Sequence, residues 1–213
     1  MELILSSIIT AISNFLVFAA IPFIWWLIFH RKKVNFFTWL GFIKPQLKSK
    51  WWMLVIFAVV YLFVYFFDMT QFVSEESMNV VENSASISAN AFTGLGMAAI
   101  LPAFIQNFLG NGVCEELLYR GFINKRLCSK FGAVPGIITQ AVLFGLMHNG
   151  LYLLAGIPVG MDYHIAMFVY SAGAALLLGF LDEKIFNGSI IPGIVLHGLG
   201  NFVGTLAAAF GWW

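Results

Sequence analysis

The sequence predicts an all-α membrane protein, a polytopic bundle of about six transmembrane helices. Of its 213 residues, 61% are hydrophobic and only 10% are charged, and its mean hydropathy is +0.89. A soluble domain carries about 25% charged residues, so this chain has too few to cover a water-exposed surface. Backbone groups inside a bilayer must be hydrogen-bonded within the protein, which makes helices the expected spanning form.

Six apolar segments are each long enough to cross roughly 30 Å of hydrocarbon at about 1.5 Å per residue. They are Leu3–Phe29, Trp51–Phe67, Ala91–Phe122, Val134–Leu154, Ile165–Leu181 and Ile190–Trp213. The first is too long for a signal peptide and follows no basic stretch, so we expect a retained helix. In the third, Pro102 and Gly110–Gly112 are candidate positions for a kink or a break.

The chain divides into two regions. Residues 1–90 hold N-terminal transmembrane helices, and residues 91–213 hold the helical core that carries the polar motifs described below. Between the first two apolar segments, Asn35–Lys50 mixes aromatic residues with lysines and is expected at the membrane interface. Thr70–Asn90 is rich in Ser, Asn and Glu and is expected to form an exposed outer loop.

The basic residues predict the orientation. With six alternating crossings, every Lys and Arg except Arg120 falls on one side of the membrane: Arg31, Lys32, Lys33, Lys44, Lys48, Lys50, Lys125, Arg126, Lys130 and Lys184. The Asp and Glu residues on the opposite side are Glu2, Asp68, Glu75, Glu76, Glu82 and Asp162, and no Lys or Arg lies there. The positive-inside rule then places both termini outside the cytoplasm. The Trp51–Trp52 and Trp212–Trp213 pairs suit the membrane interface.

Two further features of the composition are informative. The net charge is +1, which gives no indication of a nucleic-acid partner. The only cysteines, Cys114 and Cys128, share one stretch with basic residues, so we expect free thiols.

Ionisable residues inside apolar segments are costly and usually face a bundle interior or a cavity. In the third segment, Glu116 and Arg120 are four residues apart, so they share a helical face and can pair. Glu115 points about 100° away from Glu116 and so does not face Arg120. Burial disfavours the charged form of a carboxyl group, so Glu115 can take up a proton and is a candidate general base. The alternative is an ion pair, Glu116 with Arg120, that only fixes helix packing.

Two other apolar segments carry polar residues at helical spacing. Phe144 and His148 lie on one face, and His148 considered alone is more often a packing residue. His197 and Asn201 also share a face; in isolation the pair is usually interhelical hydrogen bonding, and the nearby glycines allow close helix approach. Taken together, three segments carry groups that need polar partners, which one shared buried cavity could supply.

These motifs resemble a known family. Glu115-Glu116-x-x-x-Arg120, Phe144-x-x-x-His148 and His197-x-x-x-Asn201 match, in order, the three motifs of the CAAX-protease and bacteriocin-processing (CPBP or Abi) family. The resemblance runs from about Gly112 to Phe202. It implies an all-helical intramembrane endopeptidase. Eukaryotic and archaeal members cleave near the C-terminus of prenylated CAAX proteins. Bacterial members are linked to peptide maturation, bacteriocin self-immunity or partner regulation, and we expect a bacterial plasma-membrane location.

The resemblance and the residues together suggest a mechanism. Glu115 and His148 would bind and deprotonate a water, and His197 and Asn201 would donate hydrogen bonds to the developing oxyanion. Glu116, Arg120 and Phe144 would support these groups. The expected substrate is a membrane-embedded or lipid-anchored peptide or protein.

Other functions remain open at this stage. No cofactor is expected, but a zinc-dependent version would use Glu115, His148 and His197 as ligands. A nucleophilic role for Cys114 ranks below both. A non-catalytic immunity or scaffold protein could use the same cavity for binding alone, and a small transporter could use the buried Glu and His to relay protons.

Overall fold

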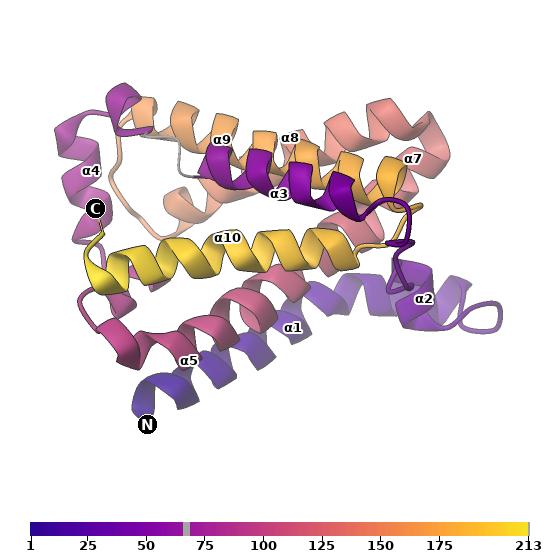
Figure 1. Cartoon of the computed structure of the whole chain (residues 1–213), viewed down its shortest axis with the longest axis horizontal. Coiled ribbons are helices and arrows are strands. Elements are labelled where there is room, and N and C mark those ends of the chain that lie inside the picture. The colour runs from indigo at the N-terminus through magenta and orange to yellow at the C-terminus, as the bar shows by residue number, and fades with distance from the viewer. Residues whose placement is uncertain (66–68, 213) are drawn as a thin grey trace.

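The computed structural model describes residues 1–65 and 69–212, and every regular element in this part of the chain is a helix (Figure 1). The α-helices are α1 (Glu2–Phe29), α2 (Phe36–Leu40), α3 (Trp51–Tyr65), α4 (Glu75–Glu82), α5 (Ile100–Phe104), α6 (Cys114–Glu116), α7 (Lys125–Phe131), α8 (Ala133–Leu154), α9 (Met161–Phe180) and α10 (Ile191–Phe210). Three 3₁₀-helices are η1 (Met69–Phe72), η2 (Ser88–Phe92) and η3 (Gly96–Ala99), and three π-helices are η4 (Ile105–Val113), η5 (Leu117–Asn124) and η6 (Leu181–Ile185). The predicted all-α class is confirmed. The predicted segment end at Phe67, the acidic Asp68 and the aromatic Trp213 lie outside the described residues.

Among the described residues, five helical stretches are long and apolar enough to cross a membrane. They are Glu2–Phe29, Gly96–Phe131, Ala133–Leu154, Met161–Ile185 and Ile191–Phe210. Each corresponds to one of the predicted segments. The remaining predicted segment contains α3, which is apolar but has 15 described residues and extends for only about 22 Å at 1.5 Å per residue.

The third apolar segment is one continuous helical stretch of 36 residues from Gly96 to Phe131. The break considered at Pro102 does not occur, because this proline is the third residue of α5, where an amide N–H has no α-helical partner to lose. Gly110–Gly112 lies inside η4. At these glycines the helix therefore widens to π geometry rather than ending.

Helix α10 occupies the middle of the bundle (Figure 1). It contacts α3 and α9 on one side and α5 and η4 on the other, while α1 packs against η4 from outside. Both described ends of the chain and α4 lie toward one end of the bundle, and α2 and α7 lie toward the opposite end (Figure 1).

The polar region predicted as an exposed loop is more ordered than expected. It folds into η1, α4 and η2, and the Ser74 hydroxyl caps α4 by accepting a hydrogen bond from the Ser77 amide. Asp162, at the start of α9, accepts hydrogen bonds from the Ser74 amide at 2.6 Å and from the Ser77 hydroxyl at 3.2 Å. The region is therefore tied to α9.

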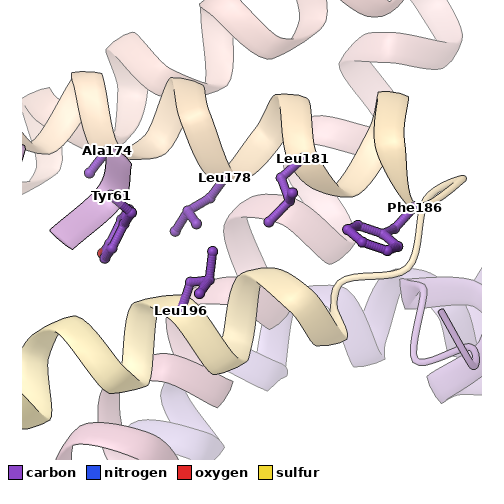
Figure 2. Close-up of a cluster of buried hydrophobic side chains, with 6 residues drawn as sticks. All are labelled: Tyr61, Ala174, Leu178, Leu181, Phe186 and Leu196. Carbon is purple, nitrogen blue, oxygen red and sulfur yellow. The ribbon is translucent and has the colours of Figure 1, made fainter. Parts of the chain in front are cut away.

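Buried apolar side chains join α3, α9 and α10 (Figure 2). Tyr61 of α3 and Leu196 of α10 pack against four residues of the α9–η6 stretch and its end: Ala174, Leu178, Leu181 and Phe186. Leu181 directly precedes Asp182, and Leu196 directly precedes His197. This cluster therefore fixes the relative position of two segments that carry buried polar residues.

Candidate active site

Three of the predicted site residues lie within six consecutive residues of the continuous Gly96–Phe131 stretch. Glu116 and Arg120 are fully buried, and Arg120 Nη1 lies 3.1 Å from Glu116 Oε1. Glu115 points elsewhere and keeps 15% of its side chain exposed. The two adjacent carboxylates thus have different surroundings, as their helical positions predict.

His197 of α10 lies between these two carboxylates. Its Nδ1 is 2.8 Å from Glu116 Oε1, and its Nε2 is 3.7 Å from Glu115 Oε2. A bond from Nδ1–H to Glu116 fixes the ring and directs Nε2 toward Glu115. Asn201 follows four residues later on the same face of α10 and is half-buried.

Glycines bring α10 close enough to the Gly96–Phe131 stretch for these contacts. A Cβ added at Gly112 of η4 would lie 3.3 Å from the Gly198 Cα, and one added at Gly198 would lie 2.5 Å from the Phe108 ring. Gly198 directly follows His197. The close packing therefore occurs beside the contact between His197 and Glu116.

Phe144 of α8 is the residue through which His148 joins the site. The Phe144 ring centroid lies 4.5 Å from that of His148, 6.1 Å from that of His197 and 4.9 Å from that of Tyr119. The Arg120 guanidinium carbon is 4.5 Å from the same centroid. His148 Nδ1 lies 3.0 Å from the Phe144 carbonyl oxygen. When Nδ1–H donates to this carbonyl, Nε2 carries the free lone pair.

The structure therefore brings the predicted site residues together to different degrees. Glu115, Glu116, Arg120 and His197 are in direct contact or within ion-pair distance. His148 is connected to them through the ring of Phe144, and Asn201 by its position one turn beyond His197.

Sequence reasoning missed one buried carboxyl group. Asp182 follows directly after the fifth predicted apolar segment, which ends at Leu181, but η6 continues this helix to Ile185 and Asp182 is fully buried. It follows the apolar run directly and stands beside Glu183 and Lys184, which is typical of a solvated helix end. The continuation of the helix through Ile185 was the missing information.

The zinc version of the site stays a prediction. In the described part of the chain, no group of three or more His, Cys, Asp or Glu side chains is arranged to hold a metal ion. Metal analysis of the purified protein tests whether Glu115, His148 and His197 hold zinc. Both cysteines are free thiols, as predicted; Cys114 is buried and its Sγ contacts the Leu109 carbonyl oxygen at 3.1 Å.

Comparison with known proteins identifies the family. The chain is 32% identical over 115 residues to an uncharacterized protein of Treponema pallidum (strain Nichols), covering 50% of this chain and 58% of that protein. The chain thus spans somewhat over half the length of this relative. No solved structure matches it. Residues 97–203 match the Rce1-like family, described as type II CAAX prenyl endopeptidases. This match covers half of the chain and contains Glu115, His148, His197 and Asn201, so the protein belongs to the Rce1-like family.

Proposed function

We propose that this protein is an intramembrane endopeptidase that cleaves a membrane-embedded or lipid-anchored peptide or protein. The observation that carries the proposal is the position of Glu115. Its carboxylate lies in the bundle interior, 3.7 Å from His197, while its neighbour Glu116 is engaged by Arg120 and His197. Glu115 is therefore the carboxylate of this pair that is available to take a proton.

In the proposed reaction, Glu115 and His148 bind a water molecule. Since His148 Nδ1–H donates to the Phe144 carbonyl, the Nε2 lone pair can accept a hydrogen bond from this water. Glu115 takes a proton as the water oxygen attacks the scissile carbonyl carbon. The C–N bond then breaks, and Glu115 returns the proton to the leaving amine.

The oxyanion formed by this attack needs hydrogen-bond donors. His197 and Asn201, one turn apart on α10, are the proposed donors. Doubly protonated His197 donates from both nitrogens, so Nδ1 keeps its bond to Glu116 while Nε2 reaches the oxyanion. The carboxylates of Glu115 and Glu116 balance the positive charge of this imidazolium.

The substrate class follows from the membrane location and the family. The family description names CAAX prenyl endopeptidases, so a peptide ending in a prenylated cysteine and three further residues is the first substrate to test. A buried site also requires that the scissile bond enter the bilayer interior, which a lipid anchor promotes.

The first test compares purified wild-type protein with Glu115→Gln in liposomes containing a prenylated CAAX peptide. Glu115→Gln keeps the side-chain shape but removes the base, and should lower cleavage by about 10²–10⁴-fold. The matched control is Cys114→Ser at the adjacent position. It should retain cleavage, because the Cys114 thiol faces the Leu109 carbonyl. Equal cleavage by Glu115→Gln and wild type would contradict the proposal.

A second comparison covers other substrates. New peptide termini are identified by mass spectrometry in host membranes carrying wild-type protein or Glu115→Ala at matched expression. Termini that require Glu115 identify the substrate. Unchanged termini with a mutant that remains functional in its host would instead favour a non-catalytic immunity or scaffold role.

A further inference from the structure

We propose that Asp182 is a positioning residue of this site: its protonated carboxyl donates a hydrogen bond to Glu116, which in turn holds His197. The inference rests on the proposed function for its catalytic consequence. The state of Asp182 itself can be measured without any cleavage assay.

Asp182 connects two helices beside the site. It is fully buried in η6, and its Oδ1 accepts a hydrogen bond from the Gly193 amide at 3.0 Å. Gly193 lies in the first turn of α10, four residues before His197. Asp182 therefore holds the beginning of the helix that carries His197.

The second oxygens of Asp182 and Glu116 both face Gly193 of α10. A Cβ added at Gly193 would be 2.5 Å from Asp182 Oδ2 and 3.0 Å from Glu116 Oε2. Both oxygens are buried, and neither has a hydrogen-bond partner among the described residues. Two acceptor oxygens facing one small space are costly unless a proton lies between them.

The surrounding charges assign that proton. In the proposed reaction Arg120 and the protonated His197 balance Glu115 and Glu116, so an ionised Asp182 would be a third buried carboxylate against two cations. Nearby Lys125 pairs with Glu183 at 3.0 Å, and both are partly exposed. Two crowded carboxyl groups do not both ionise readily. Asp182 is therefore the neutral member and the hydrogen-bond donor.

This arrangement explains how Glu116 is held. Its Oε1 faces His197 and Arg120. Its Oε2 accepts the hydrogen bond from the protonated Asp182 carboxyl. Fixing both oxygens fixes the orientation of the His197 ring, because the ring follows the carboxylate that accepts from its Nδ1.

Infrared spectroscopy of the purified full-length protein tests the protonation directly. The wild type should show the C=O band of a buried protonated carboxyl at neutral pH. The band should disappear in Asp182→Asn and persist in Glu183→Gln, the adjacent carboxylate that pairs with Lys125. A ¹³C label on aspartate carboxyls should shift the band in unmutated protein, which contains only three aspartates. The label keeps the test valid if a variant does not fold.

Cleavage assays test the positioning role. Asn can keep both contacts of Asp182, accepting from Gly193 and donating to Glu116, so Asp182→Asn should remain within about threefold of wild type. Asp182→Ala loses both contacts and should cleave about 10- to 100-fold more slowly.

The outcomes separate the two proposals. An absent band, or a band unaffected by aspartate labelling, overturns the assignment of the proton to Asp182. A folded but inactive Asp182→Asn overturns the positioning role, because it would show that Asp182 acts as a charge. If no peptide is cleaved by any form of the protein, the proposed function fails while the infrared result still decides the state of Asp182.

Discussion

Phe144 has no ionisable group, yet its ring contacts three of the polar residues of the site. His148, His197 and Arg120 all lie around it, and Arg120 stands over its face at 4.5 Å. A desolvated cation over an aromatic face is stabilised by about 2 kcal/mol. Phe144 therefore supports the buried guanidinium and packs beside both histidines.

Replacing this ring by an aliphatic side chain should weaken the site without removing any proposed catalytic group. We expect Phe144→Leu to cleave about tenfold more slowly and to lower the free energy of unfolding by about 1–3 kcal/mol. Cleavage rates and denaturant unfolding in mixed micelles measure the two effects. The matched control is Phe180→Leu, because Phe180 is 42% exposed and only stacks on Phe57. Equal behaviour of the two variants would contradict the role given to Phe144.

For single residues, the sequence predicted the contacts between side chains that lie four positions apart on one helix. Glu116 with Arg120, and Phe144 with His148, are in contact as four-residue spacing predicts. The contact between Glu116 and His197 joins residues 81 positions apart, and no local pattern encodes it. Asp182 was missed because burial depends on which helices surround it.

At the scale of elements, two glycines determine how closely α10 approaches the Gly96–Phe131 stretch. Gly112 and Gly198 lie where α10 meets η4, and Phe108 fills the space beside Gly198. The sequence predicted that glycines near His197 permit close packing. It did not predict the π-helices η4 and η5 on either side of α6, because π geometry has no recognisable residue pattern.

The close contact between Gly198 and the Phe108 ring gives a prediction that a second glycine can control. Gly198→Ala should lower the free energy of unfolding by about 1–3 kcal/mol, because its Cβ would lie 2.5 Å from the Phe108 ring. It should also slow cleavage, since His197 is its neighbour. Gly173→Ala in α9 meets no atom within 4 Å and should be neutral or stabilising by up to about 1 kcal/mol. Similar losses of stability in both variants would show that helix packing at Gly198 is not the cause.

At the scale of the whole molecule, the charged segments separate along the bundle. The acidic helix α4 lies at one end, and α2 and α7, which are flanked by or contain basic residues, lie at the other (Figure 1). The positions of the apolar helices along the chain were predictable from hydropathy. Which helices pack against each other was not, because all of them are apolar and hydropathy does not distinguish one packing partner from another.

The orientation in the membrane is open to a direct test. In a Cys128→Ser background, Glu76→Cys should react with a membrane-impermeant thiol reagent in intact cells, whereas Lys48→Cys should react only after lysis. Both positions are exposed, and the remaining Cys114 is buried. Labelling of Lys48→Cys but not Glu76→Cys in intact cells would reverse the orientation.

The contact between Glu116 and His197 also has a consequence for biosynthesis. A ribosome adding about 5–20 residues per second needs roughly 4–16 s to cover the 81 residues between them. During this interval Arg120, made four residues later, is the one partner already available to Glu116. The nascent chain can thus enter the bilayer with that charge paired, while the candidate site stays incomplete until α10 arrives. If the protein is the endopeptidase proposed above, a partly synthesised chain therefore does not yet have its complete site.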